Sequence, residues 1–140
     1  MAKARKRSEE DRIPIARNKK ALRNFFILDT FEAGIALRGS EVKSVRQHNV
    51  NLKDSYARIK NGELFLYNMH VSPYEKSRIE EIDPRRTRKL LMHRREIDRL
   101  AGKLTDKSLT MVPLEIYMVK NLVKVTLALA KGKLKRDKRR

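Results

Sequence analysis

Apolar and polar residues alternate most regularly in two neighbouring stretches, residues 55–60 and 63–71. Alternation with a period of two is typical of a β-strand that buries one face. Asn61-Gly62 stands between the two stretches, and both residues tolerate the positive φ angles that a two-residue type I′ turn requires. The pattern therefore predicts a β-hairpin in this part of the chain.

A second, longer pair of alternating stretches covers residues 110–119 and 122–130. Lys120-Asn121 lies between them and is the expected turn. Pro113 interrupts the first stretch, and because proline has no amide hydrogen we expect it at a sheet edge or a bulge. Residues 25–28 are dense in aromatic and aliphatic side chains and predict a further strand.

Residues 31–46 begin as an apolar strand segment and continue into a short helix. Ser40 suits the N-cap position, since its hydroxyl can accept an amide hydrogen of the first turn. Val42 and Val45 lie three positions apart and are expected to face inward. The outward-facing residues would then be Glu41, Lys43, Ser44 and Arg46. Such a corner is either a docking surface or a connecting helix that closes one end of the domain.

A helical insert is predicted between the two hairpins, at about residues 84–102. Asp83-Pro84 has the residue types of an N-cap followed by the first helical position, and Gly102 is the expected stop. A break near His93 is an alternative, because Glu96 three residues later could restart a helix. The apolar stripe of this helix would consist of Leu90, Leu91, Ile97, Leu100 and Ala101.

These elements add up to a mainly β fold. We expect about six strands, the helix after residue 40 and the helical insert to form a small antiparallel barrel, and an OB-like barrel is the leading candidate. The barrel domain would cover residues 14–130. Residues 1–13 are predicted to be a basic, disordered N-terminal arm, and residues 131–140 a basic C-terminal tail.

Charge narrows the class of partner. The 140 residues include 35 Lys and Arg against 17 Asp and Glu, which gives a net charge of +18. This excess favours a polyanionic partner that is bound with strong salt dependence. No segment approaches the ~20 consecutive apolar residues of a membrane-spanning helix, and the N-terminus lacks the apolar core of a signal peptide. We therefore expect a cytoplasmic protein without a membrane partner.

Residue patterns for catalysis or metal binding are weak. The sequence has no cysteine, and its three histidines are scattered, so no usual zinc-ligand spacing occurs. Gly34 and Gly39 have the spacing of a phosphate-binding loop, but Ser40-Glu41 follows where that loop needs a lysine. Paired carboxylates fall in predicted loops, at Glu9-Glu10 and Glu80-Glu81. We expect no enzyme activity, no metal and no cofactor.

Cations and aromatic side chains favour nucleic-acid binding instead. Arginines crowd the predicted insert helix, and further cations flank the barrel at Arg38, Lys43, Arg46, Lys120 and Lys124. Aromatic rings could stack on bases, and the candidates are Phe25, Phe31, Tyr56, Phe65, Tyr67 and Tyr117. Because the chain has few aromatic residues, most are expected to fill the core, and we assign Phe26, Ile27 and Phe65 to it.

Six segments, in this order, resemble the SsrA-binding protein family, also called small protein B. They read "NKKA", "FEAGIALRGSEVKSVR", "NLKDSYARIKNGELFLYNMHVSPY", "DPRRTRKLLMHRREIDRL", "VPLEIY" and "LALAKGK" followed by "DKR". The resemblance implies an OB-like barrel with three helices and no enzymatic activity. It also implies binding to the tRNA-like domain of transfer-messenger RNA, a second contact with ribosomal RNA in the decoding region of the small subunit, and a monomeric protein.

The resemblance also carries functional positions over to this chain, and neighbouring cations complete the set. The predicted RNA-binding residues are Asn18, Lys19, Arg23, Glu32, Gly34, Gly39, Ser40, Glu41, Val42, Lys43, Ser44, Arg46, Lys120 and Lys124. The predicted ribosome-directed tail residues are Lys131, Gly132, Lys133, Asp137, Lys138 and Arg139. In the family this tail is unstructured in solution and becomes helical in the message channel of the ribosome.

The sequence departs from the family pattern at two places that bear on function. Arg23-Asn24-Phe25 replaces a His-x-Tyr motif, and an arginine there could stack on a base or pair with phosphate. The sequence stops at Arg140, where family members usually continue with more basic residues, so we expect either a short member or a shortened chain. Two other functions stay open: a general OB-fold ribosomal or single-stranded RNA-binding protein, and a nuclease.

Overall fold

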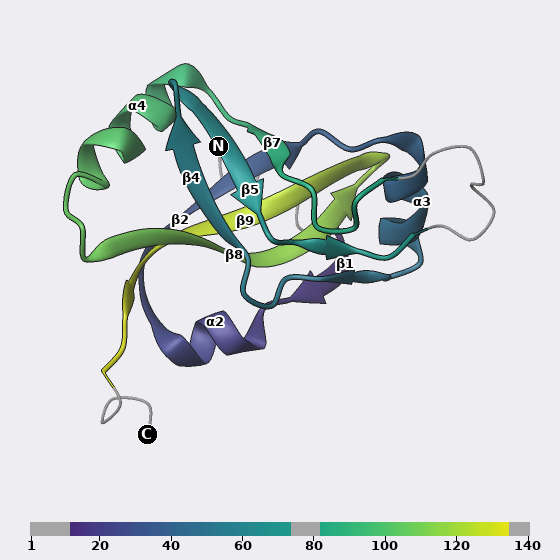
Figure 1. The fold of residues 1–140 in the computed structure, drawn as a ribbon, viewed down its shortest axis with the longest axis horizontal. Helices are drawn as coiled ribbons and strands as arrows, with labels where there is room; N and C mark the ends of the chain where they lie inside the picture. The colour runs from purple at the N-terminus through teal and green to yellow at the C-terminus, as the bar shows by residue number, and fades with distance from the viewer. Residues whose placement is uncertain (1–11, 74–81, 135–140) are drawn as a thin grey trace.

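The computed structural model describes residues 12–73 and 82–134. Its helices are α2 (Lys19–Asn24), α3 (Gly39–Arg46) and α4 (Arg94–Lys103). Its strands are β1 (Arg12–Arg17), β2 (Phe25–Ile35), β3 (Val50–Asn51), β4 (Tyr56–Lys60), β5 (Glu63–Tyr67), β6 (His70–Val71), β7 (Arg88–Leu91), β8 (Leu109–Val119) and β9 (Leu122–Gly132). Figure 1 shows how they are arranged.

Six of the strands close into a barrel. They follow the order β8-β4-β5-β7-β2-β9, and antiparallel pairing of β9 with β8 completes the ring. β1 pairs with β8 outside this ring, and β3 and β6 form a separate two-stranded sheet. The described residues therefore form the mainly β, OB-like barrel with three helices that the sequence predicted.

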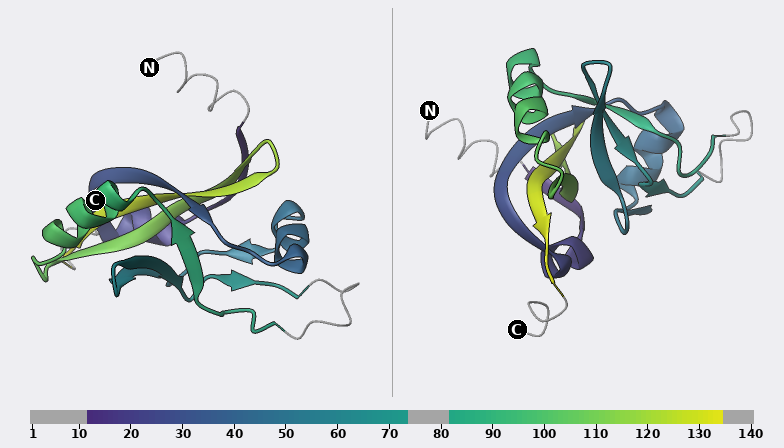
Figure 2. Two further views of the ribbon diagram at one scale, coloured as in Figure 1. Left: turned by 90° about the horizontal axis from the view of Figure 1, so that it is seen from above. Right: turned by 60° about the vertical axis from the view of Figure 1, so that its left-hand side comes forward.

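The three helices of the described residues occupy different places around the barrel. α3 and α4 lie at opposite ends, as the views in Figures 1 and 2 agree. α2 packs along β8 and β2. The candidate RNA-binding residues on α2 and α3 are therefore held on different parts of the molecule.

The turns of both predicted hairpins are confirmed. Asn61 and Gly62 have φ angles of 53° and 75°, as a type I′ turn requires. Lys120 also has a positive φ, 56°, at the turn between β8 and β9. The register of β8 against β9 shifts between Pro113 and Glu115, so the proline lies at a bulge.

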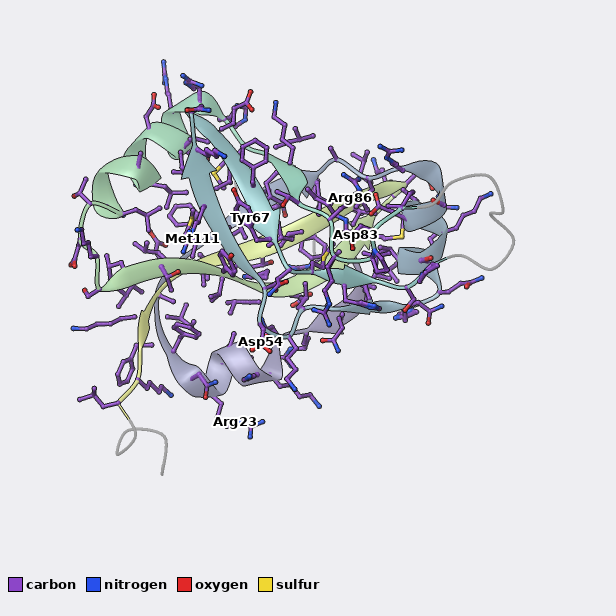
Figure 3. All side chains as sticks on the ribbon, viewed as in Figure 1. Arg23, Asp54, Tyr67, Asp83, Arg86 and Met111 are labelled. Carbon is purple, nitrogen blue, oxygen red and sulfur yellow. The ribbon has the colours of Figure 1, made fainter. Side chains whose placement is uncertain are left out.

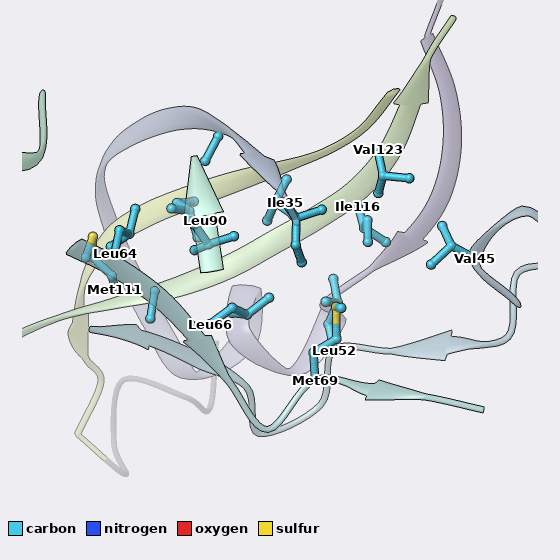
Figure 4. Packing of buried hydrophobic residues seen from close by; sticks show 14 of the residues in the cluster. Ile35, Val45, Leu52, Leu64, Leu66, Met69, Leu90, Met111, Ile116 and Val123 are labelled. Atoms are coloured by element: carbon cyan, nitrogen blue, oxygen red, sulfur yellow. The ribbon is translucent and has the colours of Figure 1, made fainter. Parts of the chain in front are cut away.

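The core fills the barrel with aliphatic and methionine side chains. Leu64, Leu66, Leu90, Met111 and Ile116 are fully buried in one cluster, which Figure 4 shows from close by. A smaller cluster lies under α2 and consists of Ala21, Val112, Ala128 and Ala130, with Phe25, Ile27 and Leu114 partly buried against it. Burying these side chains is the main favourable contribution to folding.

Two of the three core assignments among residues 25–65 hold only in part, and one is wrong. Ile27 and Phe65 are half-buried, whereas Phe26 is 45% exposed. The reason is the alternation of side chains along β2. Ile27 points to the cluster under α2, so its neighbour Phe26 points to the opposite face, where Lys133 lies 5.2 Å from the ring centre.

The single insert helix predicted for residues 84–102 is wrong in its first half. Arg88–Leu91 is strand β7, whose Leu90 pairs with both Leu64 of β5 and Ile35 of β2. These two pairings close the barrel, so tertiary structure outweighs the local helix signal at Asp83-Pro84. The helix begins after the N-cap His93, which confirms the alternative of a break there.

Within the true helix α4, the apolar stripe is partly as expected. Ile97 and Leu100 are buried, whereas Ala101 is exposed. The helix extends one residue past the expected stop at Gly102, to Lys103. Leu91, which the same stripe included, lies in β7 and is 53% exposed.

Both predicted domain boundaries need correction. β1 begins at Arg12, and Ile13 pairs with Met118, so these two residues belong to the barrel rather than to the arm. Lys131 and Gly132 extend β9 and pair with Phe26 and Phe25, and the Lys133 amide donates to the Asn24 carbonyl at 2.8 Å. The rest of the predicted arm (1–11) and tail (135–140) lies outside the described residues.

Candidate nucleic-acid interface

Helix α3 turns a different face inward from the one that its apolar spacing predicts. Val45 is buried as expected, but Val42 is only half-buried. Glu41 and Ser44, both predicted to face outward, are 4% and 1% exposed. Ser40 is not the N-cap either, because the helix begins at Gly39 after Arg38, whose amide donates to the Glu41 carboxylate at 2.9 Å.

Glu41 is buried because two arginines reach it from the segment before β7 and from β7 itself. Arg88 Nε donates to Glu41 Oε2 at 2.7 Å, and Arg86 Nε lies 3.1 Å from both carboxylate oxygens. Arg88 is completely buried and also donates to the carbonyl oxygens of Met69 and Pro84. We call Glu41, Arg86 and Arg88 the buried ion cluster. It fastens α3 to the barrel.

The electrostatics of this cluster follow from its hydrogen bonds. Burial by itself would raise the pKa of the Glu41 carboxyl, but the hydrogen bonds from Arg86, the Arg38 amide and Arg88 outweigh it and lower that pKa. Glu41 is therefore ionised at neutral pH, and both of its carboxylate oxygens accept hydrogen bonds from within the protein. Ser44 also has an internal partner, because its hydroxyl donates to the Ser72 carbonyl at 2.7 Å.

Asn18 also has an internal structural role. Its Oδ1 accepts the Ala21 amide at 3.0 Å and caps α2. Its Nδ2 donates to the carbonyl oxygens of Leu52 and Pro113, at 3.2 and 2.9 Å, and the residue is 4% exposed. The structure thus uses every polar atom of this side chain to join α2 to the barrel.

Glu32, Gly34 and Lys124 come together in one cleft. Gly34 is paired with Lys124 of β9 on one side and with Leu91 of β7 on the other, and Glu32 lies two residues before it on the same face of β2. The cleft has a volume of about 620 Å³ and is lined by Thr30, Phe31, Glu32, Gly34, Leu91, Met92, His93, Glu96 and Lys124. We call it the Glu32 cleft.

Gly34 leaves space in the Glu32 cleft because it has no side chain. A Cβ atom built on this residue would lie 3.4 Å from Leu91 Cβ, in contact with the neighbouring strand. Leu91 is 53% exposed and offers an apolar surface beside the charged pair. The sequence did not single out Leu91 as a site residue, because its apolar character read as part of a helix stripe. Its place at the cleft depends on pairing between β7 and β2.

The carboxylate of Glu32 is held from two directions. Lys124 Nζ donates to Oε1 at 3.0 Å, and the Tyr117 hydroxyl donates to Oε2. Burial would raise the pKa of Glu32, but the hydrogen bonds from Tyr117 and Lys124 and the charges of Lys124 and Arg12 lower it. The side chain is still 48% exposed, so an ionised carboxylate with a fixed orientation faces the cleft.

The remaining candidates are spread over several elements. Lys19 and Arg23 are exposed on α2, where Figure 3 shows Arg23 pointing away from the barrel. Lys43 and Arg46 lie at the surface of α3, and Lys120 lies in the turn between β8 and β9. Asp137, Lys138 and Arg139 lie outside the described residues.

Three of the aromatic candidates have rings that are buried or already in contact with another side chain. Tyr117 is 1% exposed, so stacking of a base on its ring is excluded in this conformation. Tyr56 and Tyr67 stack on each other across β4 and β5, with ring centres 5.3 Å apart. The guanidinium of Arg58 lies 5.1 Å from the centre of the Tyr56 ring. These half-exposed rings already have partners within the protein.

Residues 12–73 and 82–134 contain no group of three or more acidic or histidine side chains that could hold a metal ion. No helix in these ranges is long and apolar enough to cross a membrane.

Comparison with known proteins identifies close relatives. The sequence pattern of a family described as "SmpB protein" matches residues 15–140. The SsrA-binding protein of Caldicellulosiruptor saccharolyticus is 57% identical over 136 residues, which cover 97% of this chain and 86% of the relative. The SsrA-binding protein of Halothermothrix orenii is 58% identical over 125 residues, or 89% of this chain and 81% of the relative.

A solved structure has the same fold. It is described as "tmRNA-SmpB: a journey to the center of the bacterial ribosome". Its matching chain superposes with a TM-score of 0.73 at 47% sequence identity, over 90% of this chain and 92% of that chain.

Proposed function

The chain belongs to the SmpB protein family, and on that premise we propose that it binds the tRNA-like domain of transfer-messenger RNA and delivers it to stalled ribosomes. The observation that carries the proposal is its likeness, at 47% identity over 90% of the chain, to the SmpB chain of a tmRNA-SmpB structure. The chain would act as an RNA-binding partner in the cytoplasm, as a monomer and without catalysis of its own.

The Glu32 cleft is our candidate for the RNA contact. RNA binding at phosphates needs cations, which explains Lys124 but not Glu32. A carboxylate can accept hydrogen bonds from the edge of a base or from a ribose 2′-hydroxyl, a group that separates RNA from DNA. Glu32 is ionised, oriented by two donors and half exposed. It would therefore read a donor group on the RNA, while Lys124 faces a neighbouring phosphate.

The exposed cations would add affinity without sequence preference. Lys43 and Arg46 on α3, and Lys19 and Arg23 on α2, are at the surface. Contacts of such residues with phosphates fix the orientation of an RNA and make its affinity strongly dependent on salt. Arg23, which stands where relatives often have histidine, would pair with phosphate or stack on a base.

Three predicted contact residues act on the RNA indirectly under this proposal. Asn18, Glu41 and Ser44 have their side chains buried and hydrogen-bonded within the protein. Asn18 holds α2 in place, and Glu41 and Ser44 hold α3. We propose that they position the exposed cations of these helices instead of touching the RNA.

The C-terminal segment would serve the ribosome. Lys131 and Gly132 are paired in β9, so the proposed ribosome-directed segment starts after Lys133. Asp137, Lys138 and Arg139 match the family tail signature and would act in the decoding region of the small subunit. The barrel and the tail would thus have separate tasks, RNA capture and ribosome engagement.

Substitutions in the Glu32 cleft test the RNA-binding part of the proposal. Glu32→Gln and Lys124→Ala are each expected to weaken binding of the tRNA-like domain roughly 10- to 150-fold, because each removes one charged hydrogen-bonding group, a loss of roughly 1.5–3 kcal/mol. Filter binding at moderate salt measures the effect. Glu63→Gln and Lys89→Ala, in an exposed ion pair on β5 and β7, are the matched controls. Equal losses in both pairs of variants would contradict the assignment of the cleft.

A further inference from the structure

A row of polar contacts on the outer face of the barrel connects Arg12, the first described residue, to the Glu32 cleft. Glu115 of β8 is paired with Thr126 of β9, which is paired with Glu32 of β2. Two residues further along β8, on the same face, Tyr117 is paired with Lys124 of β9. Directly paired residues share a face of a sheet, so side chains from three strands form one outward-facing group.

Tyr117 is buried although it lies outside the barrel. Its neighbours Ile116 and Met118 point into the core, so by alternation the Tyr117 ring points outward. Yet the residue is only 1% exposed. Arg12 at the start of β1 is part of its cover, since the guanidinium carbon lies 3.6 Å from the centre of the Tyr117 ring.

Arg12 is itself fixed in this position. Its Nη2 donates to Glu115 Oε1 at 3.0 Å and to Thr126 Oγ1 at 3.3 Å. The guanidinium therefore lies over the tyrosine ring while its Nη2 is hydrogen-bonded to β8 and β9. A planar, forked cation can make both kinds of contact at once, and a lysine cannot.

The Tyr117 hydroxyl continues the chain of contacts into the cleft. It donates to Glu32 Oε2, and Lys124 Nζ donates to the other carboxylate oxygen. Burial, the hydrogen bond to Glu32 and the negative charge of Glu32 raise the pKa of Tyr117. The hydroxyl therefore keeps its proton and remains a donor to Glu32 throughout the physiological pH range.

We infer that Arg12 is a positioning residue for RNA recognition, which acts on the Glu32 carboxylate through Tyr117. By holding the ring against β8, Arg12 fixes the direction of the hydroxyl and thereby the orientation of the carboxylate in the cleft. The inference rests on the proposed function, because it concerns the same cleft. It makes strand β1, part of which was predicted to belong to a disordered arm, a component of the binding site.

A double-mutant cycle on RNA affinity tests this route. Arg12→Ala and Tyr117→Phe are each expected to weaken binding of the tRNA-like domain about five- to tenfold, through the loss of a fixed donor to a charged group. The double variant is expected to be no weaker than the weaker single variant, because both changes break one path. Additive losses would overturn the inference.

A change that keeps the charge separates positioning from direct phosphate contact. Arg12→Lys retains the positive charge but lacks the planar fork, so we expect it to weaken binding nearly as much as Arg12→Ala. In Arg12→Ala, the slope of log affinity against log salt concentration is expected to equal that of the original protein. Loss of a phosphate contact would change this slope by about one. Full affinity in Arg12→Lys, or a changed slope in Arg12→Ala, would show a direct contact and overturn the inference.

Two controls keep the outcomes distinct. Arg17→Ala removes one exposed charge from the other end of β1 and is expected to change affinity less than twofold, as for a surface charge (~0–1 kcal/mol). Circular dichroism at the assay temperature shows whether each variant is folded, and Tyr117→Phe removes the hydroxyl while it keeps the ring. If Glu32→Gln binds normally, the proposed cleft itself fails. If Glu32→Gln weakens binding but Arg12→Ala and Arg12→Lys do not, the inference about Arg12 alone is wrong.

Discussion

Glu41→Gln is expected to lower the free energy of unfolding by about 3–5 kcal/mol, since it leaves a buried cation unpaired. Arg88, the cation concerned, is completely buried, and Glu41 Oε2 lies 2.7 Å from its Nε. Glutamine keeps the size of the side chain but removes the charge that compensates two arginines. Urea unfolding, followed by circular dichroism, measures the loss.

An exposed ion pair provides the matched control for Glu41. Lys89 and Glu63 lie 3.4 Å apart with side chains about half exposed, so Glu63→Gln is expected to cost only ~0–1 kcal/mol. Arg88→Met combined with Glu41→Gln is expected to recover part of the loss, because the unpaired buried charge is gone. Equal small losses for Glu41→Gln and Glu63→Gln would show that the buried cluster does not hold α3.

The buried ion cluster also predicts a dependence of stability on pH. The pKa of Glu41 is lowered in the folded protein, from an ordinary value of 4.5. The stabilisation is therefore fully present above pH 4.5 and is lost as the pH falls through the lower, folded-state pKa. Glu41→Gln removes this contribution, so its free energy of unfolding is expected to fall less steeply on acidification than that of the original protein.

The second large effect is expected in the tail. Asp137→Ala combined with Lys138→Ala should abolish peptide tagging on stalled ribosomes while RNA affinity stays within about twofold, because the net charge that drives phosphate binding is unchanged. A reconstituted tagging reaction and filter binding measure the two activities. Lys135→Ala, which removes a charge outside the signature, serves as control and is expected to retain tagging. A parallel fall in RNA affinity and tagging would contradict the separate tasks of barrel and tail.

Local signals predicted the parts of the fold that local chemistry determines. Asn61-Gly62 specifies its turn because few other residues accept two successive positive φ angles. Alternation identified β4, β8 and β9, since one face of each packs into the barrel core. Pro113 could be assigned to an edge or a bulge because its missing amide hydrogen cannot be satisfied in a regular ladder.

The predictions that were wrong concern residues whose structure depends on tertiary contacts. Leu90-Leu91 fits a helix stripe and a strand equally well, and only pairing with β2 and β5 selects the strand. Glu41 was expected outside because the spacing of Val42 and Val45 assigned those two residues to the inner face of the helix. Nothing near it in the sequence reveals Arg86 and Arg88, which lie more than 40 residues away and compensate its charge.

The Glu32 cleft could be predicted from the sequence only in part. Glu32 and Gly34 were identified through family resemblance and Lys124 as a cation flanking the barrel, and the register of β2 and β9 brings them together. Tyr117 was identified only as a ring that could stack on bases. Its ring lies under the Arg12 guanidinium from β1, and its hydroxyl donates to Glu32. Strand β1 was not predicted, because it is short and adjoins a charged terminal segment.

The most direct test of the proposed function compares affinities of the full chain for three RNAs at moderate salt. We expect the tRNA-like domain of transfer-messenger RNA to bind at least about tenfold more tightly than an elongator tRNA of similar charge, which requires only ~1.4 kcal/mol of specific contacts. A short unstructured RNA is expected to bind more weakly still. Equal affinity for all three would contradict the proposal and indicate a general RNA-binding barrel.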